Sequence, residues 1–335
     1  MSDERRILLA HGNGGRLMRE LIEEVFAHHL AGPHLDTRAD AVTLPWQTNE
    51  LVLTTDGFTV QPLEFPGGDI GSLAVHGTVN DLAVSGATPI FLALSVFIEE
   101  GFELARLGRI VASLARAARE DGVQVVAGDT KVLPRGECGG LYLSTTGIGR
   151  LAREVRIGMD RISPGDRLLL SGPVGDHGIS VLLARGDFGL AGKLRSDAAS
   201  VLPFTQALLG LRGLRFMRDP TRGGLATVAH EIARASGLEV RLEESRIPVR
   251  ETVRAACEML GYDPMFLACE GRVVAVVAPE DTECAIAAWR GLPGGTDAAV
   301  IGEARSGSHG VVLRTELGGE RLLEELEEDP LPRIC

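Results

Sequence analysis

The sequence predicts an α+β fold of two domains followed by a short tail. Apolar residues alternate between helical and strand-like spacing along the chain, without a strict β-α-β rhythm. The length of 335 residues favours two domains, because a single hydrophobic core rarely grows past about 250–300 residues. The 42 glycines are spread among apolar segments, which is typical of tight turns rather than of disorder.

The N-terminal domain is predicted over residues 1–152. Its elements, in order, are a strand at 7–10, a glycine-rich turn at 11–15 with an amphipathic helix after it, a strand at 51–55, a helix at 69–85, a strand at 89–98, a helix at 103–120 and strands at 123–127 and 140–149. Gly86 and Pro89 end the helix at 69–85. Gly128 follows the strand at 123–127.

The C-terminal domain is predicted over residues 153–317, after a charged linker that contains Ser163-Pro164-Gly165. Strands are expected at 167–171, 238–242, 272–277, 298–301 and 310–313, and helices at 179–185, 197–209, 223–235 and 250–260. Residues 318–335 form the predicted mobile tail, which is acidic and ends in Cys335. Pro330 and Pro332 favour an extended approach to that terminal thiol.

The composition excludes several classes of protein. A net charge of −12 with only 4% aromatic residues argues against a nucleic-acid binder. Apolar runs are too short to span a bilayer, and the first residues show no signal-peptide pattern. Five cysteines without a CxxC pair indicate the reduced cytoplasm rather than a disulfide framework or a zinc site.

Familiar nucleotide-binding signatures are absent. Residues 187–194 approach a Walker A loop, but Asp187 replaces its first glycine and Leu194 its final Ser or Thr. Gly12 and Gly14 begin a dinucleotide fingerprint in which Leu17 occupies the place of the third glycine.

Four aspartates stand at the edges of predicted elements, beside small residues. They are Asp56, Asp81, Asp129 and Asp219. Carboxylates in such places can bind Mg²⁺, which completes its coordination with phosphate oxygens and water. The predicted helix N-terminus at Gly223 would add backbone donors for phosphate. The alternative for each aspartate taken alone is a helix cap or a turn.

Several short sequence motifs resemble those of the ATP-binding superfamily of aminoimidazole ribonucleotide synthetase, to which thiamine-phosphate kinase and selenophosphate synthetase also belong. They are Gly67-Gly68-Asp69, the run from His76 to Ala83, the run from Ser85 to Pro89, Gly128-Asp129-Thr130-Lys131 and the run from Asp219 to Leu225. Two further words, Ala268-Cys269-Glu270-Gly271-Arg272 and the terminal Pro332-Arg333-Ile334-Cys335, resemble the hydrogenase-maturation carbamoyl dehydratases. The resemblance covers nearly the whole chain.

The resemblance implies a two-domain fold in which the N-terminal domains of two copies form a dimeric β-barrel. It implies that a partner carbamoyltransferase loads a carbamoyl group onto the thiol of Cys335. ATP with Mg²⁺ would then drive dehydration of this thiocarbamate to a thiocyanate. The cyano group would pass to iron held by a scaffold complex, where it becomes a cyanide ligand of the [NiFe]-hydrogenase iron centre.

The match also assigns roles to individual residues. Asp56, Asp81, Asp129 and Asp219 would bind Mg²⁺ and the ATP phosphates, Asn80, Thr130, Gly12 and Gly14 would contact the nucleotide, and Cys335, Glu270 and Lys131 would be catalytic. Glu270 is the candidate base, with Lys131 assisting or exchanging roles. The alternatives are a surface lysine for Lys131, a salt-bridged carboxylate for Glu270 and a frayed end for Cys335.

Two other functions remain open from the sequence. The first is another ATP-using activity of the superfamily, a small-molecule kinase or a selenophosphate synthetase. The latter would carry a reactive cysteine or selenocysteine near the N-terminus, whereas the first cysteine here is Cys138. The second is a non-catalytic scaffold that carries the tail for assembly, which would show no Mg²⁺-dependent nucleotide binding.

Overall fold

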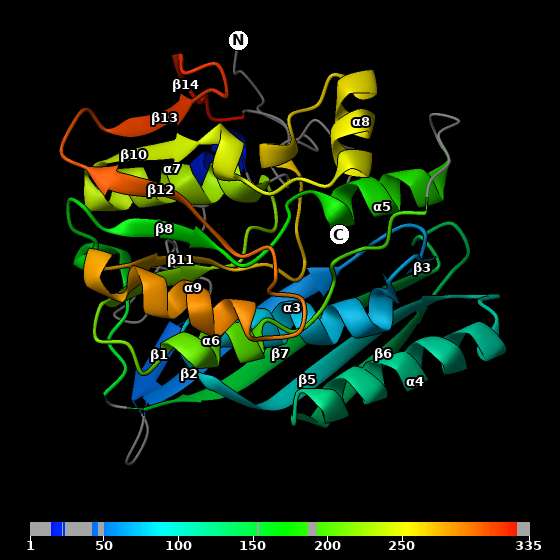
Figure 1. The fold of residues 1–335 in the computed structure, drawn as a ribbon. Coiled ribbons are helices and arrows are strands. Elements are labelled where there is room, and N and C mark those ends of the chain that lie inside the picture. Colours follow the sequence, from blue (N-terminus) through cyan, green and yellow to red (C-terminus); the bar gives the residue numbers. More distant parts are fainter. Residues whose placement is uncertain are drawn as a thin grey trace, which may run out of the picture.

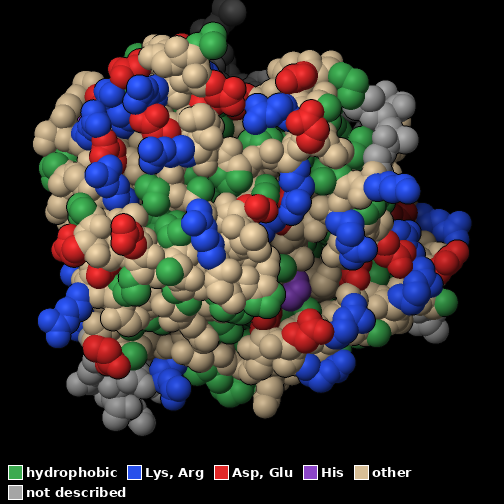
Figure 2. Space-filling model, in the orientation of Figure 1, with side chains coloured by type: hydrophobic (Ala, Val, Ile, Leu, Met, Phe, Trp, Pro, Cys, Tyr) green, Lys and Arg blue, Asp and Glu red, His purple; other side chains and the backbone are tan. Residues whose placement is uncertain are grey.

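Two β-sheets with helices around them make up the chain in a computed structural model (Figure 1). The structure describes residues 15–21, 23, 42–45, 50–152, 154–186 and 193–326. Within these ranges, no helix is both long and apolar enough to cross a membrane. Acidic and basic side chains are intermingled over the face seen in Figure 2.

The first sheet has the strand order β1-β2-β7-β5-β6. Its strands are β1 (Val42–Pro45), β2 (Glu50–Phe58), β5 (Thr88–Glu99), β6 (Gln124–Leu133) and β7 (Leu141–Leu151). The helices of this part are α1 (Arg16–Leu21), α3 (Ile70–Val84) and α4 (Leu104–Glu120), and a short ribbon is formed by β3 (Glu64–Phe65) and β4 (Gly68–Asp69). The Asp69 carboxylate caps α3 by accepting bonds from Gly71 and Ser72 N–H.

The second sheet has the order β14-β13-β10-β12-β8-β11-β9. Its strands are β8 (Arg167–Leu170), β9 (Leu214–Arg218), β10 (Glu239–Glu243), β11 (Val274–Val277), β12 (Ala299–Arg305), β13 (Gly310–Arg314) and β14 (Glu320–Leu322). Its helices are α5 (Asp176–Arg185), α6 (Leu202–Leu208), α7 (Gly224–Ser236), α8 (Glu251–Leu260) and α9 (Thr282–Arg290).

Helix α3 is shared by both parts of the molecule. Leu73, Val75 and Val79 join a core with β5 and β7, while Ala83 and Val84 pack with β8, β9 and β11. Figure 1 shows α3 between the first sheet and the helices of the second part. Because α3 is buried on nearly all sides, polar residues on it lie at the junction of the two parts.

The α+β architecture is confirmed, and most predicted elements lie where the patterns placed them. Helix α9 and strands β1, β3, β4, β9 and β14 were not predicted, and the strand expected at 7–10 lies outside the described residues. The helix expected at 197–209 begins only at Leu202, and the strand expected to end at residue 127 continues to Leu133. The described part of the single chain shows an open first sheet, so the dimeric barrel stays a prediction.

The segment predicted as a mobile tail begins inside the second sheet. Residues 320–322 pair with β13, and Leu323 is buried in the core beside them. Glu325 forms ion pairs with Arg19 of α1 and Arg234 of α7, and Arg16 N–H donates to the carbonyl of Leu326. The chain is therefore anchored as far as Leu326, and residues 327–335 lie outside the described part.

Candidate active site at the domain junction

Asp56 and Asp81 lie on facing elements, strand β2 and helix α3. Thr145, which pairs with Asp56 across the sheet, hydrogen-bonds Thr78 of α3, so this face of β2 is the one that α3 covers. The hydroxyl of Thr54, two residues before Asp56, donates to the Asp81 carboxylate at 2.7 Å. Packing of α3 on β2 thus places Asp56 on the inner face of the sheet and Asp81 on the side of α3 that faces it.

Asp219 follows strand β9 and begins the turn that leads into α7. Gly223 and Gly224 have φ values of 71° and 59°, which favour glycine. A Cβ on Gly224 would lie 2.6 Å from the carbonyl oxygen of Leu267, so only glycine allows this close approach. The N–H of Cys269 donates to the Pro220 carbonyl at 3.0 Å. These contacts hold the segments around Asp219 and Glu270 against each other.

The three carboxylates of Asp56, Asp219 and Glu270 repel one another in a poorly solvated place. Burial raises the pKa of Asp219 to about 6, with repulsion from Asp56 adding to the effect and Arg218 opposing it. Burial also raises the pKa of Glu270 well above its usual range, and Asp219 and Asp56 raise it further. The pKa of Asp56 is raised overall, because burial outweighs the opposing effect of Arg222, whose guanidinium lies 3.7 Å away.

This electrostatic arrangement fits a divalent cation that is shared with phosphate groups. Among the described residues, no three Asp, Glu, His or Cys side chains converge to hold a metal ion between them. Mg²⁺ usually takes only one or two carboxylates and fills its remaining positions with phosphate oxygens and water. The mutual repulsion of Asp56 and Asp219 would be relieved by such an ion. The four predicted aspartates do not form one ligand set within the described chain.

Asn80, predicted to contact the nucleotide, has all its side-chain polar atoms directed at the backbone. Its Nδ2 donates to the carbonyls of Ala199 at 3.1 Å and Glu270 at 3.2 Å. Its Oδ1 accepts from the N–H of Val201 at 2.8 Å. Asn80 therefore ties α3 to the segment before α6 and to the residue predicted as the base.

Asp129, Thr130 and Lys131 lie in a different place from these carboxylates. The sequence put Asp129 after a strand, and this was wrong: all three residues are inside β6, the edge strand. Asp129 pairs with Ser95 and Lys131 with Phe97, on the face of the sheet away from α3. Their side chains are 65% and 63% exposed, and the carboxylate lies 3.6 Å from the ammonium group.

Other predicted residues lie outside the described part of the chain: Gly12, Gly14 and Cys335. Two residues that sequence reasoning did not single out contribute to the site. Arg222 lies beside Asp56, and the sequence clue to its role was its place in the motif from Asp219 to Leu225. Asp197 holds the peptide of Glu270, and no local pattern marked it because its segment was read as helix.

Comparison with known proteins shows the family. The sequence matches AIR synthase related protein, N-terminal domain, over residues 38–151 and AIR synthase related protein, C-terminal domain, over residues 163–314. It is 46% identical over 329 residues to "Carbamoyl dehydratase HypE" of Azotobacter vinelandii, which covers 98% of this chain and 96% of that protein.

Two solved structures are also similar. The crystal structure of the hydrogenase maturation protein HypE in complex with ATP has a TM-score of 0.82 and 44% identity, and the match covers 98% of this chain and 100% of that one. The crystal structure of the HypE–HypF complex has a TM-score of 0.87 and 42% identity, covering 91% of this chain and 99% of that one.

Proposed function

The chain belongs to the AIR synthase related family and, within it, to the HypE carbamoyl dehydratases of hydrogenase maturation, and from this premise we propose that it dehydrates a carbamoyl group carried on its own Cys335. The thiocarbamate becomes a thiocyanate at the expense of ATP. The observation that carries the proposal is Glu270, a carboxylate that is 4% exposed beside Asp219 and Asp56 at the domain junction. A buried carboxylate with a raised pKa is a strong proton acceptor once it is ionised.

The proposed reaction has two steps. The carbamoyl oxygen attacks the γ-phosphorus of ATP, ADP leaves, and one N–H proton passes to Glu270. The C–O bond then breaks, phosphate leaves with the bonding electron pair and takes the second N–H proton, and the C≡N bond forms. The oxygen of the lost water ends in phosphate, and Glu270 releases its proton to solvent.

The chain's own groups supply what this chemistry requires. Glu270 accepts a proton within a site from which water is largely excluded, so hydrolysis of the activated carbon is suppressed. We expect one or two of the carboxylates of Asp56, Asp81 and Asp219 to bind Mg²⁺ together with ATP phosphate oxygens, and the ion would screen the phosphate charge. Arg222 offers a cation beside Asp56 for the phosphate oxygens.

The position of Asp129 and Lys131 leads us to propose a homodimer. In one chain these residues lie on the outer face of the first sheet, about three strand spacings, or roughly 14 Å, from Asp56. That outer face presents Phe97 of β5, and Val125 and Val126 are exposed on the neighbouring edge strand β6. A second copy packed on this sheet would cover the face, and Lys131 would serve the site of the partner chain.

Two further partners follow from the same proposal. A carbamoyltransferase loads the thiol, in line with the solved HypE–HypF complex. An iron-carrying scaffold complex receives the cyano group. Both steps need a reduced thiol, which agrees with a cytoplasmic location.

Cyanate offers a test that needs no partner protein, because it adds to thiolates and gives S-carbamoyl cysteine. Replacing Cys138 and Cys284 by Ser removes the two non-buried cysteines of the described chain. Burial raises the pKa of Cys257 to about 12 and that of Cys269 well above its usual value, so both react slowly. Isotope-labelled cyanate, ATP and Mg²⁺ should then yield a labelled thiocyanate with the loss of one water, seen by intact mass and infrared absorption.

The matched control is Cys335→Ala in the same background. It should bind ATP with unchanged affinity and form no thiocyanate. Thiocyanate on a chain that lacks Cys335 would refute the proposal. A small-molecule kinase would instead turn over added acceptors equally well with and without Cys335.

A further inference from the structure

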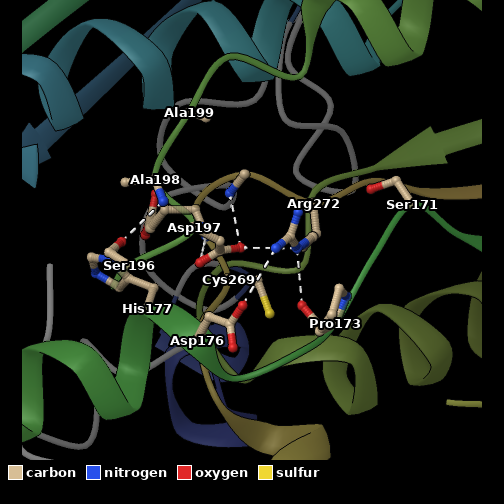
Figure 3. Close-up of polar contacts among 12 residues, drawn as sticks. Ser171, Pro173, Asp176, His177, Ser196, Asp197, Ala198, Ala199, Cys269 and Arg272 are labelled. Carbon is tan, nitrogen blue, oxygen red and sulfur yellow. Dashed lines mark hydrogen bonds and ion pairs between the residues drawn. The ribbon is translucent and has the colours of Figure 1, made fainter. Parts of the chain in front are cut away.

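Asp197 is a fully buried carboxylate in the extended segment before α6. It lies between the Glu270–Gly271 peptide and the guanidinium of Arg272. Its Oδ1 accepts from Glu270 N–H at 3.4 Å and its Oδ2 from Gly271 N–H at 3.3 Å. The Arg272 Nε lies 3.4 Å from the same carboxylate. Figure 3 shows Asp197 facing Arg272, whose Nε also donates to the Pro173 carbonyl at 2.9 Å and whose Nη2 lies 3.4 Å from Asp176.

The three groups that contact the Asp197 carboxylate in this way are all donors. Two backbone N–H groups and one guanidinium suit an ionised carboxylate, because a protonated one would need an acceptor for its own hydrogen. The charge on Arg272 compensates the buried negative charge. The contact with the peptide therefore consists of two hydrogen bonds, of 3.4 and 3.3 Å, to a buried carboxylate. Burial raises the pKa of Asp197, and the positive charge of Arg272 opposes that rise.

The backbone around Glu270 is shaped for this contact. A Cβ on Gly271 would lie 1.9 Å from the Asp197 carbonyl oxygen, so no other residue permits the approach. The Ala199 N–H donates to the Glu270 carbonyl at 3.3 Å, and Asn80 donates to that same oxygen. The backbone of Glu270 is thus held by two elements: the segment before α6 contacts both its N–H and its C=O, and α3 contacts its C=O through Asn80.

The segment that carries Asp197 is itself fixed to both parts of the molecule. Ser196 N–H donates to the Pro66 carbonyl at 2.8 Å, and the Ser196 hydroxyl hydrogen-bonds His177 Nδ1 at 2.8 Å. The Ala198 N–H donates back to the Ser196 hydroxyl at 2.9 Å. The segment around Asp197 therefore links the Glu270 backbone both to the N-terminal domain, through Pro66, and to α5, through His177.

We propose that Asp197 is a positioning residue that orients Glu270 toward the carbamoyl nitrogen. This inference rests on the proposed function, because it takes Glu270 as the base. Asp197 does not touch substrate in this scheme; it fixes the peptide from which the base extends. The energetic basis is that a base displaced by about 1 Å loses on the order of a hundredfold in rate.

The test compares Asp197→Asn with Asp176→Asn in the cyanate-loaded chain. Asp176 is a matched control because it is buried and also lies 3.4 Å from Arg272, while the Glu270 and Gly271 amides donate to Asp197 and not to Asp176. Asp197→Asn should lower the single-turnover rate of thiocyanate formation about 10- to 100-fold while ATP affinity stays within about twofold. Asp176→Asn should change that rate by less than about threefold.

Equal slowing by both variants, or a wild-type rate in Asp197→Asn, would overturn the inference. Glu270→Gln separates the two levels of the argument. If it still forms thiocyanate at the wild-type rate, Glu270 is not the base and the inference falls with it, while the proposed dehydration on Cys335 stands. If Glu270→Gln is inactive while Asp197→Asn is unaffected, only the inference fails, and absence of thiocyanate on the wild-type chain would sink the proposed function itself. Asp197→Ser is a smaller neutral replacement where Asn does not pack. Hydrogen exchange on the wild-type chain adds a measurement without any variant: free exchange of the Glu270 and Gly271 amides would contradict the contact.

Discussion

The two halves of the predicted site differ in how the fold treats them. Glu270 and Asp219 are 4% exposed and are held by backbone contacts at the domain junction. Asp129 and Lys131 are more than 60% exposed on an edge strand whose residues are exposed on both faces. Both halves were predicted from short motifs that contain an acidic residue. Within a single chain, however, the side chains of one half are buried and fixed by contacts, and those of the other half are exposed.

The difference indicates which groups are ready for chemistry before assembly. A buried base needs no reorganisation when substrate arrives, which is the basis of electrostatic preorganisation. An exposed lysine on a free strand edge is solvated and loosely placed, so it acquires a fixed position only when something covers that edge. Four experiments test this comparison, in order of decreasing expected effect.

Glu270→Gln should abolish most of the dehydration. General-base catalysis contributes about 10²–10⁴-fold, so thiocyanate formation should fall by that factor while ATP still binds. The measurement is the single-turnover rate by intact mass, with calorimetry for ATP. A loss of less than about tenfold would mean that the buried half does not contain the base.

Mixing Glu270→Gln with Lys131→Ala tests whether the exposed half acts across a dimer. In a random mixture half of the dimers are mixed, and each mixed dimer has one site with both residues intact, so activity should return to about a quarter of the wild-type value. Each variant alone is the control. Failure to recover activity would place Lys131 in the site of its own chain.

Asp219→Asn should change how stability depends on pH in the metal-free protein. Because the pKa of Asp219 is raised from 3.8 to about 6, the folded chain holds the proton more tightly than the unfolded chain. The stability that this gives is complete below pH 3.8 and is lost as the pH rises through about 6. Above pH 6 the variant should be more stable than wild type by up to about 3 kcal/mol, measured by urea unfolding.

The gap between Asp219→Asn and wild type should close near pH 4. Mg²⁺ with a non-hydrolysable ATP analogue should stabilise wild type more than the variant. The same difference in unfolding free energy at every pH would show that the pKa of Asp219 is not raised in the folded chain.

Asp129→Ala should have the smallest effect on folding. Its ion pair with Lys131 is solvent-exposed on both sides, and such pairs contribute about 0–1 kcal/mol. We expect urea unfolding of the monomeric protein to change by less than about 1 kcal/mol. A larger loss would mean that β6 is less exposed than the structure indicates.

Much of the fold could be predicted from local patterns. Helix α4 is strongly periodic, and α3 is bounded by an Asp69 cap and Gly86, so both were found within a residue. Strand β9 was missed because Leu214–Arg218 is only five residues long and its apolar and basic residues do not alternate strictly. The continuation of β6 was missed because a strand that is exposed on both faces shows no alternation.

The site was predictable only in part for a related reason. Their positions at the edges of predicted elements marked Asp56 and Asp219, the family resemblance marked Glu270, and the fold brings these three carboxylates together. Whether a motif residue lies on the inner or outer face of a sheet depends on register, which local spacing does not reveal for Asp129. Asp197 acts through tertiary contact with a peptide 73 residues away in sequence, and such contacts leave no local signature.

The anchoring of the chain through Leu326 limits how far from the second sheet the thiol of Cys335 can lie. Nine residues separate Leu326 from Cys335, which at about 3.3 Å each allow a reach of roughly 30 Å, half the distance available from Gly318. Halving the radius of a tethered group raises its local concentration about eightfold. Under the proposed function, a partner's active site would therefore have to come within that distance of β14 and α7, beside which Glu325 is held. Docking geometry rather than tether length would then decide which partner is served.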